Sequence, residues 1–149
     1  MTTDDLWEFA LVCYGRPGVE PACLQLQDGG ADVCLMLCGL WLEARRVDCD
    51  AERLAALTAL AGPWQAEVVT PLRRLRRHWR QPASSDPALA KLRSEVKALE
   101  LAAERELLSR LQARCLDWPA AAAPAPWLEA LAPDQPQPLR VLREAALSR

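Results

Sequence analysis

Ten consecutive residues, Val33 to Leu42, are all apolar or glycine. A helix formed by this run has no polar side, and such a helix belongs in the centre of a bundle. Asp32 precedes the run as a good N-cap, and only one residue within it is β-branched, which favours a helix over a buried strand. A membrane span needs roughly 20 apolar residues, whereas charged residues follow directly from Glu43. We therefore predict a buried central helix from Asp32 to Arg46 and no contact with a membrane.

The composition favours an all-α fold. Of the 149 residues 51% are hydrophobic, mainly Leu and Ala, and Ile is absent. Strands are rich in β-branched residues, whereas Leu, Ala, Glu and Arg are strong helix formers. A chain of this length is expected to form one domain. The sequence predicts a single-domain helical bundle of about five main helices, with residues 1–117 as the bundle domain.

Helical periodicity and capping residues delimit the expected helical segments. Thr2 or Thr3 is predicted to cap the first, Gly62 to end the fourth, and Pro71 to kink the next one. The predicted ranges are 4–14, 18–28, 32–46, 50–62, 63–80 and 87–116. The predicted inner face of the longest segment comprises Leu89, Leu92, Val96, Leu99, Ala103, Leu107, Leu111 and Cys115.

After Asp117 the composition shifts to Ala and Pro, as in WPAAAAPAPWLEALAPDQPQP. Such a stretch has few large apolar groups and can bury little surface. We predict that residues 118–149 form a Pro/Ala-rich linker or arm with a short terminal helix, and that 120–138 is dispensable for folding. Trp118 and Trp127 are the side chains that could anchor the arm to the bundle.

The six cysteines are expected to be reduced thiols. The N-terminal sequence lacks the basic region and cleavage site of a secretory signal, which predicts a cytoplasmic protein in which disulfides are rare. Metal-binding CxxC spacing is absent, and the chain has a single His. As an alternative, Cys34 and Cys38 lie one helical turn apart, and Cys49 could approach them to form a metal or redox site. No cofactor is predicted.

Two acidic clusters are candidate sites for binding a cation or a substrate. The stretch Asp4 to Glu8 resembles the DDxxD box of helical isoprenoid synthases, but acids in the first helical turn are favoured by the helix dipole and need no ligand. Gln27, Asp28 and Asp32 bracket a Gly-Gly turn before the central helix, which also carries Trp41. The two aspartates can cap helix ends, or they can ligate a cation or orient a substrate.

Charge is unevenly distributed along the chain. Residues 1–62 carry ten acidic and four basic residues, whereas 63–80 carry five arginines and one glutamate. On a helical wheel the arginines lie opposite an apolar stripe, which predicts an outward positive face able to bind phosphates or an acidic protein surface. The predicted partner-binding residues are Arg73, Arg74, Arg76, Arg77 and Arg80.

These patterns favour a non-enzymatic helical adaptor that binds a protein or ribonucleoprotein partner through the basic helix. The overall negative charge argues against bare DNA. The alternative is a small ligand- or metal-binding helical enzyme with a pocket near Gln27, Asp28, Asp32 and Trp41. The sequence offers neither a Ser/His/Asp or Cys/His set nor a Gly-rich phosphate loop, so no catalytic residue and no metal ligand is predicted.

Three groups of residues, in order, resemble an uncharacterised bacterial family of small proteins classed as a domain of unknown function. The first group spans Leu6–Ala10, Tyr14 and Pro17–Val19, the second Cys23–Leu24, Leu26–Asp28, Asp32–Val33 and Leu40–Leu42, and the third Pro63–Trp64 and Pro71–Arg73. The resemblance covers about residues 6 to 110 and leaves out the Pro/Ala-rich arm. It implies a helical cytoplasmic protein without an established activity.

Overall fold

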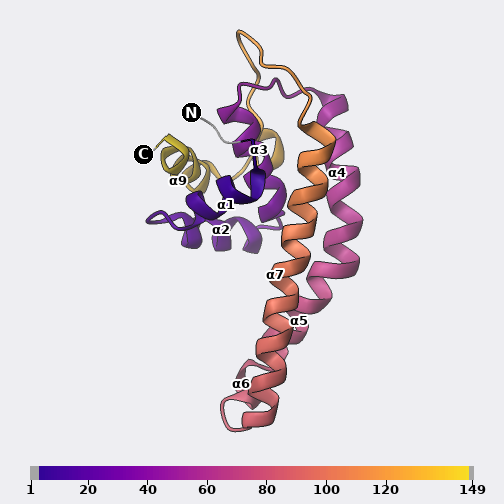
Figure 1. The fold of residues 1–149 in the computed structure, drawn as a ribbon. Helices are drawn as coiled ribbons and strands as arrows, with labels where there is room; N and C mark the ends of the chain where they lie inside the picture. The colour runs from indigo at the N-terminus through magenta and orange to yellow at the C-terminus, as the bar shows by residue number, and fades with distance from the viewer. Residues whose placement is uncertain (1–3, 148–149) are drawn as a thin grey trace.

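The computed structural model describes residues 4–147, and this part of the chain is all-α without a strand. The helices form two groups: a bundle around α3, and a long hairpin made by α4, α5 and α7 (Figure 1). The elements are α1 (Leu6–Tyr14), α2 (Val19–Asp28), α3 (Val33–Ala44), α4 (Ala51–Trp64), the π-helical η1 (Gln65–Val69), α5 (Thr70–His78), α6 (Arg80–Ala83), α7 (Pro87–Cys115), α8 (Leu128–Leu131) and α9 (Pro136–Leu147). The all-α class is confirmed, although the number of helical segments exceeds the five main helices predicted.

Helix α3 is the centre of the bundle. Every residue from Cys34 to Leu42 is buried, and the Asp32 side chain accepts a hydrogen bond from the Leu35 amide at 3.1 Å. Helices α1, α7, α8 and α9 all contact α3. The prediction of a buried central helix is confirmed.

The acidic N-terminal stretch caps α1. The Asp5 carboxylate accepts hydrogen bonds from the amides of Trp7 and Glu8, at 3.0 and 3.3 Å. The cap was predicted at Thr2 or Thr3, which lie outside the described residues. Because the Asp5 carboxylate accepts both of these hydrogen bonds as a helix cap, the structure favours capping over a DDxxD-like ligand site.

The predicted stop at Gly62 is wrong, because the chain stays helical from Ala51 through Pro63 and Pro71 to His78. Proline lacks an N–H and crowds the preceding turn of an α-helix. Here the turn before Pro71 widens into η1, in which the Thr70 amide bonds the Gln65 carbonyl. A π turn of this kind absorbs the proline without ending the helix.

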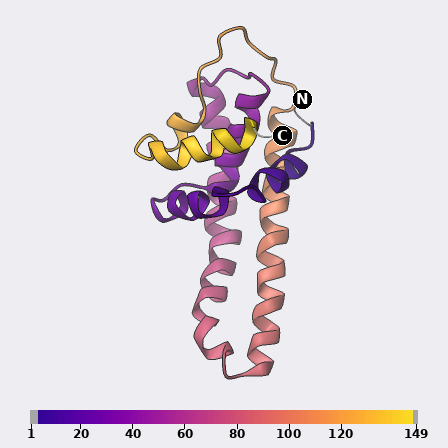
Figure 2. The same ribbon diagram turned by 90° about the vertical axis from the view of Figure 1, so that its left-hand side faces the viewer.

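The distal part of the hairpin projects beyond the bundle (Figures 1 and 2). Helix α5 has no buried residue, and the buried residues of α7 begin only at Glu100. The first half of the inner face predicted for α7, from Leu89 to Leu99, is therefore half-buried or exposed. This stretch of α7 lies beside α5 and α6 and away from α1, α2 and α3 (Figure 1).

The C-terminal arm is part of the core. Trp127 is fully buried, donates its indole N–H to the Val47 carbonyl at 2.9 Å and stacks on Trp118 with ring centroids 6.0 Å apart. Gly39 in α3 makes room for it, since a Cβ there would lie 3.2 Å from the Cβ of Trp127 and 2.9 Å from Leu131. The premise that this stretch buries little is wrong, because Trp127 and Leu128 are both fully buried.

Candidate functional site

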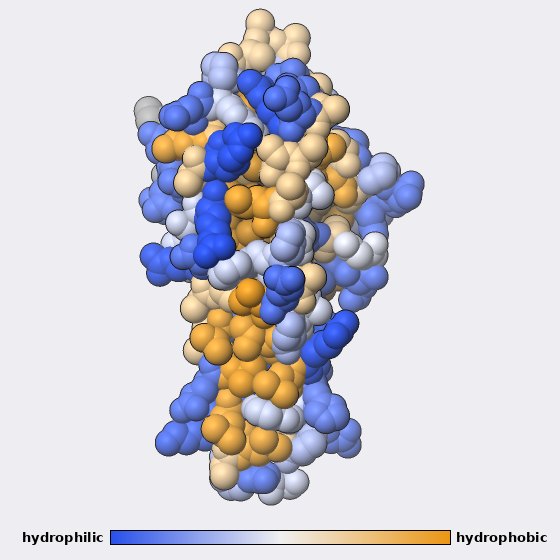
Figure 3. Space-filling view, turned by 90° about the vertical axis from the view of Figure 1, so that its right-hand side faces the viewer, coloured by the Kyte–Doolittle hydropathy of each residue, from blue (hydrophilic) through white to orange (hydrophobic). Residues whose placement is uncertain are grey.

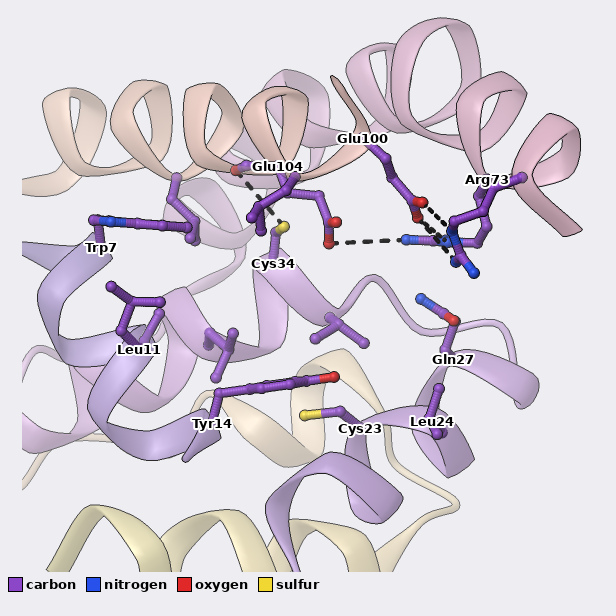
Figure 4. Close-up of a pocket in the computed structure, with 16 residues that line it drawn as sticks. Trp7, Leu11, Tyr14, Cys23, Leu24, Gln27, Cys34, Arg73, Glu100 and Glu104 are labelled. Carbon is purple, nitrogen blue, oxygen red and sulfur yellow. Dashed lines mark hydrogen bonds and ion pairs between the residues drawn. The ribbon is translucent and has the colours of Figure 1, made fainter. Parts of the chain in front are cut away.

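A cleft of about 250 Å³ lies where the bundle meets the hairpin. Helices α1, α2 and α3 form one wall, and α5 and α7 form the other (Figure 4). One end of the cleft is charged and the other is apolar.

Four side chains from the hairpin form the charged end. Glu100 accepts hydrogen bonds from the Nε atoms of both Arg73 and Arg76, at 3.1 and 2.5 Å. Glu104, one turn further along α7, lies 3.9 Å from a terminal nitrogen of Arg73. This last distance is too long for a hydrogen bond, so the Arg73–Glu104 pair is the loose pair of the cluster.

The pKa values of the two glutamates diverge within the cluster. Burial raises the pKa of Glu100, but hydrogen bonds and charge from Arg76 and Arg73 outweigh this effect and lower it. The pKa of Glu104 is raised, first by burial and then by the negative charge of Glu100. Glu104 is therefore the under-compensated carboxylate at this end.

Gln27 of α2 closes the charged end. With its amide oxygen turned towards Arg73, it accepts from both terminal nitrogens of that guanidinium group at 3.1 Å. Arg73 thus contacts α7 on one side and α2 on the other. Arg73 is therefore one of the side chains that bridge the bundle and the hairpin, as is Gln65, which donates to Asp32.

The other end of the cleft is apolar and open. Its rim carries the exposed apolar side chains Leu11, Tyr14 and Leu101, and a fourth, Leu24, lies beside Gln27 (Figure 4). Trp7 also lines the cleft, and the guanidinium group of Arg105 lies 5.0 Å from the centroid of its ring. Exposed apolar side chains clustered around a cavity are typical of ligand-binding grooves.

The cleft also contains Cys34, whose thiol lies 3.9 Å from the Glu104 carbonyl oxygen. Burial, followed by the charges of Asp32 and Glu104, raises the pKa of Cys34 well above its ordinary value. A thiol that stays protonated is a poor nucleophile. Cys34 therefore lines the cleft without offering covalent chemistry.

The four residues of the predicted pocket do not converge. Gln27 lines the cleft, and Asp32 lines a smaller adjoining cavity, where it accepts a hydrogen bond from Gln65 at 2.8 Å. Asp28 is exposed at the end of α2, and Trp41 is fully buried in the core beneath Arg45. The structure brings the first two together and leaves the other two apart.

The basic helix differs from the predicted outward stripe. Arg73, with a side chain 15% exposed, and Arg76 turn towards Glu100, whereas Arg74, Arg77 and Arg80 are exposed. The expectation that Arg73 points outward is wrong, because α5 packs on α7 and α7 carries the acids. Of the apolar stripe opposite the arginines, Leu75 is exposed and the other residues are half-buried.

One face of the distal hairpin is apolar. Leu75 of α5 and Leu92 and Leu99 of α7 are 37%, 50% and 56% exposed. Figure 3 shows a continuous hydrophobic surface along the distal hairpin, with hydrophilic residues on both flanks. We call these three leucines and the surface around them the hairpin face.

The cysteines do not form the alternative metal or redox site, in which Cys49 would approach Cys34 and Cys38. All six are free, five are buried, and the sulfur of Cys38 lies 4.0 Å from that of Cys115 rather than close to Cys49. Within residues 4–147, no group of three or more His, Cys, Asp or Glu residues is arranged to hold a metal ion. The structure therefore buries most of the thiols, and their reduced state stays a prediction.

The Arg–Glu cluster was missed by sequence reasoning, although a signal was present. Arg73 and Arg76 lie one turn apart, as do Glu100 and Glu104. The tight turn at residues 84–86 folds α7 back along α5, which sets the two pairs opposite each other. Matching charge spacing on either side of a predicted turn was the available clue.

Within the described residues, no helix combines the length and the apolar character needed to cross a membrane. No curated protein and no solved structure matches the chain. A family model does match, over residues 5–111, which include α1 to α6 and most of α7. The chain thus belongs to the family described as Protein of unknown function (DUF2390).

Proposed function

We propose that the protein is a non-enzymatic adaptor that binds another protein through the hairpin face. The observation that carries this proposal is the exposure of Leu75, Leu92 and Leu99 on a pair of helices that project from the bundle. Large exposed apolar surfaces with polar rims are typical of protein interaction sites. A projecting hairpin also gives a partner helix room to pack along it, as in a helical bundle.

The charges near this surface favour a protein over a nucleic acid. Glu100 and Glu104 together neutralise Arg73 and Arg76, so only Arg74, Arg77 and Arg80 among the arginines of the basic helix remain exposed. Nucleic-acid binding relies on many phosphate contacts by basic side chains. A protein with an apolar helix and acidic neighbours fits both the leucines and the remaining arginines.

The test is affinity capture from the native host with purified wild-type protein and the triple variant Leu75→Gln, Leu92→Gln, Leu99→Gln. These positions are exposed, so the variant should keep its melting temperature while losing the captured partner. Leu24→Gln with Leu116→Gln, two exposed leucines outside the hairpin face, is the matched control and should keep the partner. Nuclease treatment should leave the complex intact.

A second variant tests the arginines. Arg74→Gln, Arg77→Gln, Arg80→Gln should weaken the complex and reduce its dependence on salt, because only exposed charges are removed. Arg73 is left unchanged, since its replacement would break the contacts with Glu100 and Gln27. Capture that survives the leucine variant, or that disappears with nuclease, would contradict the proposal. Sedimentation of the purified protein checks whether the hairpin face instead joins two copies of this chain.

A further inference from the structure

The cleft between the bundle and the hairpin has features that the adaptor proposal does not use. Its volume of about 250 Å³ is slightly below the range of roughly 300–1,000 Å³ for sites that hold drug-sized ligands. The exposed rim of Leu11, Tyr14 and Leu101 gives it an apolar mouth. Its size and its apolar mouth fit a small molecule with an apolar body.

The charged end defines the head group of such a molecule. The guanidinium groups of Arg73 and Arg76 carry more N–H donors than Glu100 and Gln27 accept. Glu104 has its nearest ion-pair partner at 3.9 Å, beyond hydrogen-bond distance. Donor capacity and acceptor capacity therefore lie side by side at the end of an apolar cleft.

The charge balance of the cluster restricts the ligand further. The two arginines and the two glutamates cancel, and their side chains are largely withdrawn from water. A ligand with one net charge would leave an uncompensated charge in this environment, which is costly. A ligand that carries one positive and one negative group keeps the cluster neutral.

From these observations we infer that the cleft binds a hydrophobic α-amino acid in its zwitterionic form. The ammonium group bonds the Glu104 carboxylate, the carboxylate bonds the Arg73 guanidinium, and the side chain lies among Leu11, Tyr14 and Leu101. The ammonium group supplies the close positive charge that Glu104 lacks. The ligand also contacts both walls of the cleft, and so joins the bundle to the hairpin.

The test is isothermal titration calorimetry of the full chain with L-phenylalanine. Two analogues each lack one of its charges: phenethylamine has no carboxylate, and 3-phenylpropionate has no ammonium group. We expect L-phenylalanine to bind at least about tenfold more tightly than either analogue, as the loss of one charged hydrogen-bonded contact predicts. L-glutamate, which has a polar side chain, should not bind.

The variant Glu104→Gln keeps the volume of the side chain and removes its charge. It should weaken L-phenylalanine binding by about tenfold but not weaken the binding of 3-phenylpropionate, an anion that the loss of one negative charge favours. Glu106→Gln, at an exposed position on the same helix, is the matched control and should bind like the wild type. Melting temperatures of both variants check that the fold is intact.

Three results would overturn the inference: no binding of L-phenylalanine, equal binding of all three phenyl compounds, or unchanged binding by Glu104→Gln. Preferential binding of the amine would identify a cation site instead. The hairpin face is not involved in any of these measurements. Failure here would therefore leave the adaptor proposal standing, and the reverse also holds.

Discussion

Glu100 joins the two arms of the hairpin, α7 and α5, at the charged end of the cleft. In the described part of the chain it is the one charged residue that is buried, and it accepts hydrogen bonds from Arg73 and Arg76. Replacement by Gln leaves two guanidinium groups without their counter-charge. Loss of one partner from a buried ion pair costs about 3 kcal/mol.

We therefore expect Glu100→Gln to lower the free energy of unfolding by about that amount, measured by urea denaturation. Glu106→Gln is the matched control, since Glu106 pairs with Arg110 at 3.1 Å on an exposed stretch of the same helix. An exposed pair contributes less than about 1 kcal/mol. Equal losses for the two variants would show that the Glu100 contacts are not stabilising.

The lowered pKa of Glu100 predicts how this contribution depends on pH. A carboxyl group with a lower pKa in the folded chain stabilises the fold above its unfolded pKa, and this stabilisation disappears as the pH falls through the folded value. The difference in unfolding free energy between wild type and Glu100→Gln should therefore shrink below about pH 4.5, the ordinary value for Glu. The difference is the quantity to measure, because burial raises the pKa of Glu104 in both proteins and this part of the opposing effect cancels.

At the scale of elements, the C-terminal arm is held to α3 by a few specific contacts. Glu43 of α3 accepts hydrogen bonds from the amides of Trp127 and Leu128, at 2.8 and 3.0 Å, and pairs with Arg143 of α9 at 2.9 Å. The same arginine also pairs with Glu129. One carboxylate thus joins α3, α8 and α9.

Trp127→Ala is expected to lower the free energy of unfolding by about 4 kcal/mol, because it leaves a large cavity beside α3. Leu147→Ala, at a position that is 83% exposed in the same arm, should change it by less than about 0.5 kcal/mol. Denaturant unfolding monitored by circular dichroism compares the two. Truncation after Asp117 should abolish cooperative unfolding, and a truncated chain that melts like the wild type would restore the sequence-based prediction that the arm is dispensable.

At the scale of the whole molecule, the bundle and the distal hairpin differ in how deeply they are packed. Helix α3 is buried from Cys34 to Leu42, whereas α5 has no buried residue. Segments with few buried apolar contacts open locally at low free energy. The two parts should therefore open in separate steps.

Hydrogen exchange followed by mass spectrometry tests this expectation. Amides of residues 72–79 and 89–96 should exchange much faster than those of α3, by local opening of the hairpin end. Peptides from α9, which packs on the bundle, provide the comparison within the same protein. Uniform protection along α7 would show that the hairpin and the bundle unfold as one unit.

The central helix and the helical class were predictable because they depend on local information. The apolar run from Val33 to Leu42 permits only a buried segment, and Asp32 and Asp86 cap α3 and α7 as their side chains favour. The family resemblance likewise followed from local motifs, and the match over residues 5–111 agrees with it. These features needed no knowledge of which helix packs against which.

The direction of the arginines, the burial of the arm and the cleft were decided by the tertiary structure. A helical wheel separates Arg73 from Leu75, but it cannot tell which side meets another helix, and here the arginine side meets Glu100 while the leucine side faces water. The burial of Trp127 depends on Gly39, a residue 88 positions away in the sequence, leaving space in α3. Such outcomes depend on contacts between distant segments, whereas periodicity and composition report only on a segment and its immediate neighbours.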